Sequence, residues 1–148
     1  MKLTLALAYA LFLNGCTFLQ KEESPTVGAQ VGIVNHTGRF IYSATVNGAG
    51  GGNMAAWGAG GADICCTSIP SAWYPGMKVL VRWDMPEGRT HVIKEKVIEV
   101  ERYDEPGSIY MHFFPNDEVR VVVANTDGFG AKHPIAPPVK PTPVNAKK

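Results

Sequence analysis

The sequence predicts an all-β protein, an antiparallel β-sandwich with a long glycine-rich loop and a disordered proline-rich C-terminal tail. Short segments in which apolar and polar residues alternate recur along the chain, bounded by turn-forming residues. The 148 residues include 16 glycines and 11 prolines, which favour turns and loops over long helices. A chain of this length can bury a real core, so we expect one β-sandwich domain over residues 30–130.

The N-terminus has the pattern of a secretory signal peptide. Lys2 is the only charge in the first 15 residues, and an apolar run follows that is shorter than the roughly 20 residues a membrane-spanning helix needs. The run ends in Leu-Asn-Gly-Cys at Cys16, which resembles the lipobox of bacterial lipoproteins. We therefore expect residues 1–15 to be a lipoprotein signal peptide, Cys16 to carry a covalent lipid and residues 16–29 to form a tether. An ordinary secretory signal that ends at a chance cysteine is the alternative.

The expected lipid defines the compartment. Each buried CH₂ contributes about 0.8 kcal/mol to membrane binding, so several acyl chains hold a protein on the bilayer effectively permanently. Thr17 follows Cys16, and by resemblance to lipoproteins in general the lack of Asp there indicates the outer membrane. We expect a protein anchored to the membrane through its lipid, on the periplasmic side of the outer membrane.

The first strands surround a short turn. Residues 30–35 and 39–47 have strand patterns on either side of residues 36–38, His-Thr-Gly. In the second segment, one alternating set comprises Phe40, Tyr42, Ala44 and Val46.

The second half of the domain predicts two hairpins. Residues 77–83 alternate regularly, with one apolar face formed by Met77, Val79, Val81 and Trp83. A turn at Pro-Glu-Gly leads into a long, charged strand over residues 90–100, whose charged face we interpret as a solvated one. Residues 109–114 and 119–124 form the other hairpin, across residues 115–118.

Seven of the sixteen glycines lie between Gly48 and Gly61. A glycine-rich loop can hold a phosphate, but this one lacks the Lys-Ser/Thr that follows in a P-loop, so we expect a long surface loop. It carries Met54 and Trp57. An aromatic group on such a loop is a candidate contact for another protein, and folding of Trp57 back onto the core as a lid is the alternative.

With Cys16 lipidated, Cys65 and Cys66 are the remaining cysteines, and the periplasm is oxidising. The neighbours could close into an adjacent disulfide, stay as two buried thiols, or form one intermolecular bridge. A metal site with histidines is a further alternative, although adjacent cysteines lack the usual spacing of zinc ligands. Beyond the domain, residues 131–148 hold five prolines, and we expect an extended or disordered, solvated tail unless a proline-binding partner takes it.

Two classes of function find little support in the sequence. The formal charge of +1 falls to zero once Lys2 is removed, so there is no electrostatic case for nucleic acid. A catalytic set could be drawn from Ser68, His112 and Asp117, but no Gly-x-Ser-x-Gly elbow accompanies it. We expect a protein that is not an enzyme and has no cofactor or metal apart from the lipid on Cys16.

Several segments together resemble a known family. They are NHTGRFIYSATVNGAGGGN, GGADICC, IPSAWYPGMKVLVRW and YDEPGSIYMHFFPNDEVRVVVAN, within residues 31–125. They are similar to small bacterial lipoproteins of undefined function that are associated with type VI secretion, some of which are immunity proteins against antibacterial lipase (phospholipase) effectors. The resemblance implies a partner, a type VI lipase effector, and supplies no catalytic residues.

The resemblance and the anchor together predict an immunity protein that binds and neutralises such a lipase by occlusion. Tethering concentrates the binder at the membrane where the toxin acts. As partner-binding residues we predict Met54, Trp57, Trp73 and Tyr74, because aromatic anchors often dominate interfaces. The alternatives are a structural or secretion-system accessory lipoprotein that binds other proteins, and a lipid- or sugar-binding module.

Overall fold

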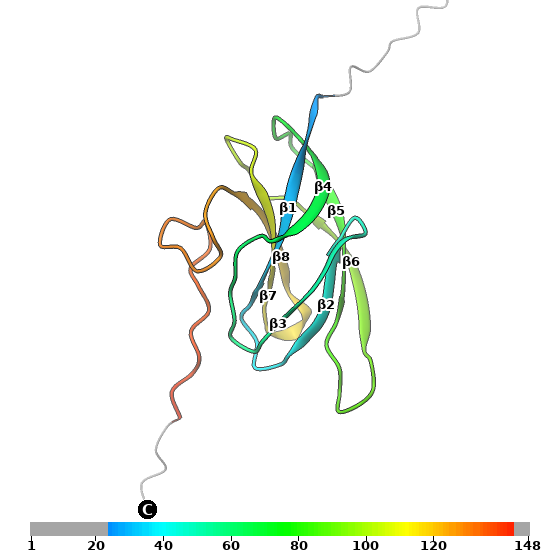
Figure 1. Cartoon of the computed structure of the whole chain (residues 1–148), viewed down its shortest axis with the longest axis vertical. Helices are drawn as coiled ribbons and strands as arrows, with labels where there is room; N and C mark the ends of the chain where they lie inside the picture. The colour runs from blue at the N-terminus through cyan, green and yellow to red at the C-terminus, as the bar shows by residue number, and fades with distance from the viewer. Residues whose placement is uncertain (1–23, 144–148) are drawn as a thin grey trace, which may run out of the picture.

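The computed structural model describes residues 24–143, so Cys16, the predicted signal peptide and most of the predicted tether lie outside the described residues. These residues form eight strands and one short turn of 3₁₀ helix, whose arrangement can be followed in Figure 1. The elements are β1 (Thr26–Asn35), β2 (Ile41–Val46), β3 (Ala49–Met54), β4 (Ile64–Pro70), β5 (Lys78–Asp84), β6 (Ile93–Glu99), β7 (Ser108–Phe113), η1 (Pro115–Asp117) and β8 (Val119–Ala124). Within residues 24–143 no helix is long and apolar enough to cross a membrane.

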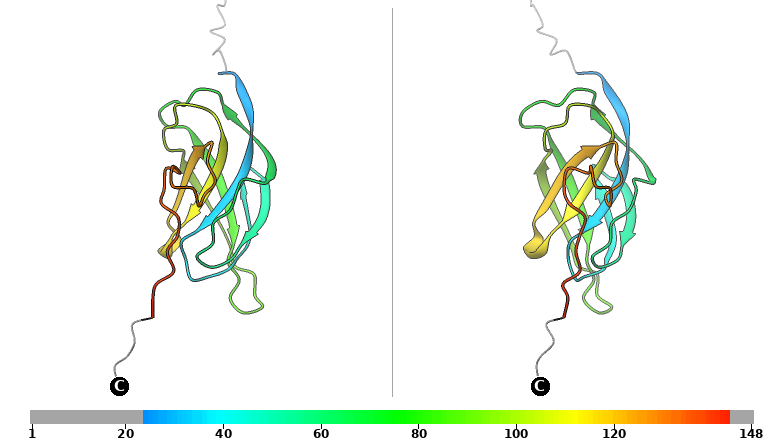
Figure 2. Two further views of the ribbon diagram at one scale, coloured as in Figure 1. Left: turned by 60° about the vertical axis from the view of Figure 1, so that its left-hand side comes forward. Right: turned by 90° about the vertical axis from the view of Figure 1, so that its left-hand side faces the viewer.

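Two four-stranded sheets pack face to face, which confirms the predicted sandwich (Figure 2). The first sheet has the order β4-β1-β7-β8 and the second has the order β3-β2-β5-β6. The pairing is antiparallel except between β1 and β7, which run parallel, so the first sheet is mixed. Five strands lie between β1 and β7 in the chain, so no hairpin turn forces these two neighbours to run in opposite directions.

The two predicted hairpins are confirmed. β5 pairs antiparallel with β6, and β7 pairs antiparallel with β8. The apolar row predicted before and along β5 faces the space between the sheets, and its members are at most 4% exposed: Met77, Val79, Val81 and Trp83. Alternation predicted burial correctly here because β5 lies in the middle of its sheet, with one side against the core and the other toward solvent.

The predicted alternation along β2 is interrupted. Ile41 and Ala44 are both buried, which places Tyr42 and Ser43 together on the outer side. The pairing of β2 with β3 changes register between Ile41 and Ala44, as a β-bulge does. The bulge therefore exposes Tyr42 and, before it, Phe40, instead of leaving them in one row with Ala44.

Two predicted boundaries are corrected by the structure. The first half of the glycine-rich stretch is not a loop but strand β3, which pairs with β2. Gly50 has a φ of 107°, a conformation that glycine adopts readily, and it lies where the pairing is irregular. At the N-terminal side, β1 begins at Thr26, inside the predicted tether, because its first residues pair with the end of β4.

The proline-rich tail also begins later than the sequence predicted. His133 and Ile135 are each 7% exposed, so they are packed and not part of a solvated tail. Ile135 joins a second apolar cluster on the outer side of the first sheet, with Val34, Tyr110 and Val122. Figure 2 shows this segment in orange and red, crossing over β7 and β8. The described tail contains no strand, as expected of its prolines.

Candidate protein-binding surface

The loop between β1 and β2 is organised by one buried side chain. Asn35 is 0% exposed, and its amide nitrogen donates to the carbonyl oxygens of Arg39 at 2.7 Å and Ala55 at 2.9 Å. Its amide oxygen accepts from the backbone N–H of Thr37 at 3.0 Å and from the Thr37 hydroxyl at 2.7 Å. Asn35 thus fixes this loop and the chain after β3 together, and every polar atom of its side chain is used.

Arg39 connects this loop to the turn of the β5–β6 hairpin. Its guanidinium donates to the carbonyl oxygen of Met85 at 2.8 Å and lies 3.4 Å from the carboxylate of Glu87. Phe40 follows directly and is 48% exposed. The motif Asn-His-Thr-Gly-Arg-Phe therefore builds a fixed end of the sandwich that presents an aromatic side chain to solvent.

From Phe40 an apolar surface continues over the outer side of the second sheet. We call it the hairpin face, and its members are the exposed side chains of Phe40, Tyr42, Leu80, Ile93 and Val97. They are five of the eight large apolar side chains that are exposed within residues 24–143, and they range from 42% to 65% exposed. Such a concentration of apolar groups on one side is typical of an interaction surface.

Two shallow hollows meet on the hairpin face at Tyr42. One, of about 180 Å³, lies over the strands, and its lining includes Ser43, Arg82 and Ile93. The other, of about 450 Å³, lies at the hairpin turn and is lined by Phe40, Tyr42, Pro86, Gly88, Arg89 and His91. Neither is deep, so the surface suits a partner with a broad apolar contact better than an enclosed small molecule.

Asp84 holds His91 at the edge of the hollow. The Nδ1–H of His91 donates to one carboxylate oxygen of Asp84 at 2.5 Å, and the backbone N–H of Val92 donates to the other at 3.0 Å. Asp84 is 6% exposed, so these bonds satisfy an almost buried carboxylate. The His91 ring also packs edge-on against Tyr42, with ring centroids 4.9 Å apart.

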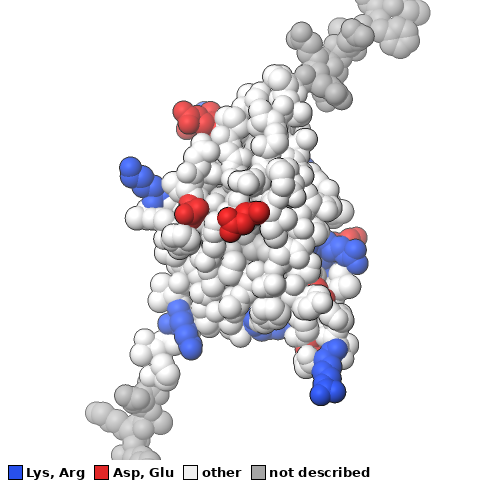
Figure 3. Space-filling view, in the orientation of Figure 1, with Lys and Arg blue, Asp and Glu red and all other residues white. Residues whose placement is uncertain are grey.

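Charged residues flank the apolar centre in opposite pairs. The register places Lys78 beside Glu99 and Arg82 beside Glu95, with Leu80 and Val97 opposite each other between them. An apolar centre with a mixed polar rim is the usual anatomy of a protein interface. Figure 3 shows basic and acidic side chains scattered over the side of the molecule in view, without a patch of one sign.

The outer side of the first sheet differs, because the chain covers it. The second apolar cluster there includes Tyr110 and Val122, and Ile135 from the C-terminal segment lies on it. The hairpin face has no such cover among the described residues. This contrast, and not exposure of single residues, makes the hairpin face the candidate binding surface.

The four predicted partner-binding residues do not form one site. Met54 and Trp73 are partly buried and pack against the core, and the indole N–H of Trp73 donates to the carbonyl oxygen of Val100 at 2.9 Å. Trp57 packs over Gly38, near the Asn35 loop, with a left-handed φ of 58°. Tyr74 is 48% exposed.

The two tryptophans on loops lie at opposite ends of the sandwich. The backbone N–H of Trp57 donates to the carbonyl oxygen of Thr37, just beyond the end of β1. Near Trp73, the backbone N–H of Ser71 donates to the carbonyl oxygen of Pro25, just before the start of β1. Ten residues of strand separate these ends, about 30 Å. Sequence analysis missed the hairpin face because apolar residues among charges in residues 90–100 were interpreted as part of a solvated strand.

Cys65 and Cys66 are joined in a disulfide. The register of β1 with β4 steps from Ala29–Thr67 to Val31–Ile64, so the two cysteines together oppose a single residue, Gln30. Successive residues of a regular strand point to opposite sides, and a bulge of two residues against one relaxes that constraint. Both cysteines are exposed, on an edge strand, and the disulfide leaves neither thiol as a metal ligand.

The residues of the hypothetical catalytic set are apart. His112 is 0% exposed and contacts two other histidines, His36 and His133, at 3.0 Å and 2.9 Å between ring nitrogens. Asp117 instead binds the ammonium of Lys94 at 2.6 Å. The pKa of His112 is lowered to about 3, chiefly by burial and to a smaller extent by the nearby His133, His36 and Arg120. No group of three or more metal-ligating side chains is arranged for a metal within residues 24–143.

One family matches this chain, over residues 34–121, and its description is "Protein of unknown function (DUF3304)". The chain belongs to the DUF3304 family. The DUF3304 match begins beside Asn35 and includes the hairpin face and both cysteines, but it ends before the C-terminal segment that covers the first sheet. Comparisons with curated proteins and with solved structures give no match. Because the DUF3304 description names no activity, the resemblance to type VI lipoproteins stays a prediction.

Proposed function

We propose that this protein is a membrane-anchored immunity protein that binds an antibacterial type VI lipase effector in the periplasm and neutralises it by occlusion. The observation that carries the proposal is the uncovered hairpin face, a broad apolar surface with a mixed charged rim on a rigid sandwich. The predicted lipid on Cys16 and the resemblance to type VI lipoproteins supply the identity of the partner.

The chemistry of a lipase fits this surface. A lipase that attacks bilayer lipid must admit acyl chains, so the surroundings of its active-site entrance are apolar. The hairpin face offers aromatic and aliphatic groups of the same character, and covering the entrance would block the reaction without any chemistry from the inhibitor. We therefore place the effector on the hairpin face, with Phe40, Tyr42 and Val97 as its central contacts.

The test is co-purification of the protein with the lipase encoded by its neighbouring gene, followed by a phospholipase assay. We expect a stable complex in which lipase activity is abolished. Tyr42→Ala and Val97→Asp should each weaken binding at least about thirtyfold if these residues are hot spots. Val139→Asp is the matched control, because Val139 is 80% exposed on the C-terminal segment and should not affect binding.

A second variant distinguishes the two candidate binding regions. If Trp57→Ala abolishes binding while the hairpin-face variants bind normally, the contact lies at the Asn35 loop and the hairpin face is the wrong location. If the wild-type protein neither binds the lipase nor protects cells that receive it in the periplasm, the immunity proposal is wrong. An accessory envelope lipoprotein that binds other proteins is then the better explanation.

A further inference from the structure

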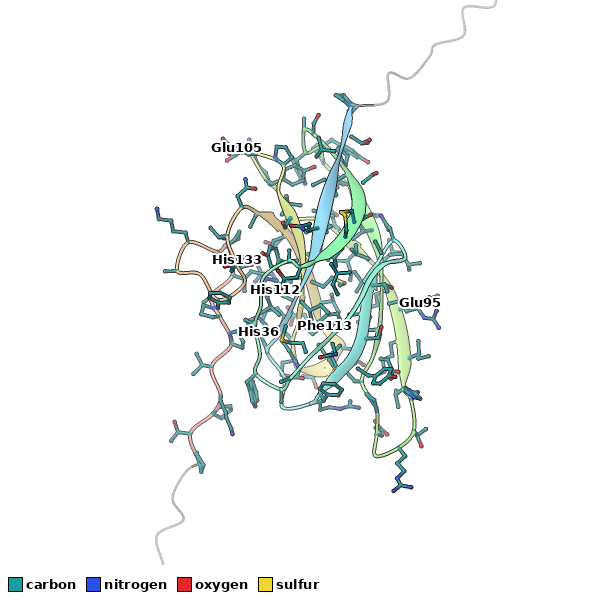
Figure 4. The ribbon with its side chains drawn as sticks, viewed as in Figure 1. His36, Glu95, Glu105, His112, Phe113 and His133 are labelled. Carbon is teal, nitrogen blue, oxygen red and sulfur yellow. A yellow bond between two sulfur atoms is a disulfide. The ribbon has the colours of Figure 1, made fainter. Side chains whose placement is uncertain are left out.

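Three histidines from distant parts of the chain form a row on the outer side of the first sheet. Figure 4 shows His36 from the β1–β2 loop, His112 from β7 and His133 from the C-terminal segment close together. The Nε2 of His36 lies 3.0 Å from the Nδ1 of His112, and the Nε2 of His112 lies 2.9 Å from the Nε2 of His133. The ring nitrogens thus form a chain of hydrogen bonds.

One carbonyl group sets the direction of this chain. The Nδ1 of His133 is 3.2 Å from the backbone oxygen of Thr126, which can only accept, and 3.3 Å from the Thr126 hydroxyl oxygen, which can accept or donate. We assign the hydrogen of His133 to Nδ1, because both oxygens can then accept from it. Its Nε2 must then accept from the Nε2–H of His112, and the Nδ1 of His112 must accept from the Nε2–H of His36. With one hydrogen on each neutral ring, each of the three contacts has one donor and one acceptor.

A count of hydrogens shows how many protons the row can take up. Five of the six ring nitrogens are used in the contacts just described, and the sixth is the Nδ1 of His36. One added proton can be placed there without loss of a hydrogen bond. A second must enter one of the two contacts between rings, where two N–H groups would face each other about 3 Å apart.

The surroundings also oppose positive charge in the row. Arg120 on β8 lies directly opposite His112 on β7, and its guanidinium is paired with Glu101 at 2.6 Å. Burial, together with Arg120, lowers the pKa of His36 as well as that of His112. Burial lowers the pKa of His133 too, although the hydrogen bond to the Thr126 backbone and the nearby Asp127 act in the opposite sense.

The row holds the C-terminal segment on the sheet. Three other contacts contribute: the N–H of Gly128 donates to the carbonyl oxygen of Gly60 at 3.0 Å, the His133 ring packs edge-on against Tyr110 with centroids 4.7 Å apart, and Ile135 packs in the second apolar cluster. Gly128 lies so close to Val34 that a Cβ there would be 2.4 Å from a Val34 methyl group. A terminal segment with few contacts is the part of a fold that opens first.

We propose that His36, His112 and His133 form a proton-operated latch, which holds residues 126–135 on the first sheet and releases them when the row takes up a second proton. No bond other than hydrogen bonds changes, and the protons come from solvent. Release uncovers the apolar side chains of Val34, Tyr110 and Val122. The latch is separate from the hairpin face, so it does not depend on the proposed immunity function.

The stoichiometry predicts a steep response to pH. The usual pKa of histidine is 6.5, so at a pH well below this value the three released histidines bind three added protons. The latched row binds at most one added proton. The equilibrium between latched and released states should therefore change at least about 100-fold per pH unit, against tenfold for a single histidine.

The test is amide hydrogen exchange of the full chain in detergent between pH 7 and pH 4, expressed as protection relative to the unstructured chain. We expect residues 126–135 to lose protection steeply on acidification while β5 stays protected. His112→Gln keeps an acceptor and a donor in the middle of the row but cannot titrate there, so release should shift to lower pH and become less steep. His91→Gln removes an exposed histidine outside the row and should respond like the wild type.

Three results would overturn the latch. Protection of residues 126–135 could be independent of pH, it could fall together with that of β5, or its slope could be tenfold per pH unit. If His112→Gln does not fold, nitrogen-15 shifts of the wild-type histidines at pH 7 provide the second measurement. We expect hydrogens on Nε2 of His36 and His112 and on Nδ1 of His133, and a hydrogen on Nε2 of His133 would contradict the proposal.

Discussion

The amide oxygen of Asn35 accepts two hydrogen bonds from Thr37, one from its backbone N–H and one from its hydroxyl group. This relationship closes the β1–β2 loop tightly around a residue that is 0% exposed. It also explains why the two residues occur in one motif. The amide oxygen of Asn35 needs a donor, which Thr37 supplies two residues later, and its amide nitrogen needs acceptors, which are the carbonyl oxygens of Arg39 and Ala55.

Replacement of Asn35 should therefore be costly. Asn35→Ala leaves the carbonyl oxygens of Arg39 and Ala55 and the groups of Thr37 without their partner, so we expect a loss of about 2–4 kcal/mol in the free energy of unfolding, measured by urea denaturation. Asn35→Asp keeps the acceptor but loses the two donated bonds, and it should be destabilised as well. A variant as stable as the wild type would show that the loop does not depend on Asn35.

The two sides of β5, one facing the core and one facing solvent, can be tested by substitution. Trp83 is 2% exposed and packs toward Phe113 across the sandwich, with ring centroids 5.6 Å apart. Trp83→Ala should cost about 3–5 kcal/mol of unfolding free energy, because it leaves a cavity in the core. Leu80→Ala, on the exposed side of the same strand, should cost less than about 1 kcal/mol. Equal losses would mean that the outer side of β5 is buried in solution.

The adjacent cysteines should be oxidised in the mature protein. Intact-mass analysis should find the protein about 2 Da lighter than its fully reduced form, since a disulfide forms with the loss of two hydrogens. The double variant Cys65→Ser with Cys66→Ser should show no mass change on reduction. It should also be nearly as stable as the wild type, because a ring between neighbours restricts the unfolded chain very little. Alkylation of two thiols in unfolded, unreduced protein would contradict the disulfide.

Cys16 can be tested by lipid labelling. Cells given a clickable fatty acid should label the wild-type protein and not Cys16→Ser, and the variant should leave the membrane fraction, because the predicted acyl chains are the anchor that it would lose. Cys65→Ser is the matched control, since it removes a cysteine from the folded domain and should be labelled normally. Equal labelling of Cys16→Ser and the wild type would reject the predicted anchor.

Stability should fall with acidification through His112. Its pKa is lowered to about 3 in the folded protein, from 6.5, so the unfolded state binds the proton more readily. The stabilisation is fully present above pH 6.5 and is lost as pH falls from 6.5 toward 3, at no more than about 1.4 kcal/mol per unit. Between pH 6.5 and pH 5 His112 alone should contribute a loss of about 2 kcal/mol to the unfolding free energy measured by urea denaturation, and His36 and His133, whose pKa values are also lowered, should add to it. His112→Gln should lose less over the same range, and an identical loss would assign the effect to other groups.

Local patterns predicted most of the strands, and they failed where contacts between distant segments decide. The strict alternation from Met77 to Trp83 identified a half-buried strand, because a strand that is apolar on one side has few other ways to bury that side. Alternation did not identify β3, because its glycines are typical of a loop and it becomes a strand only through its pairing with β2. Nor could it find the hairpin face, since Leu80 and Val97 become one surface only when β5 and β6 pair.

The sequence by itself determined the β class, the two hairpins and the proximity of Cys65 and Cys66, because each depends on residues close together in the chain. Only the tertiary structure decided the parallel pairing of β1 with β7, the uncovered side of the second sheet and the row of His36, His112 and His133. These features join residues many positions apart. They exist only when burial of apolar surface brings the segments together, and no periodicity in the sequence encodes that meeting.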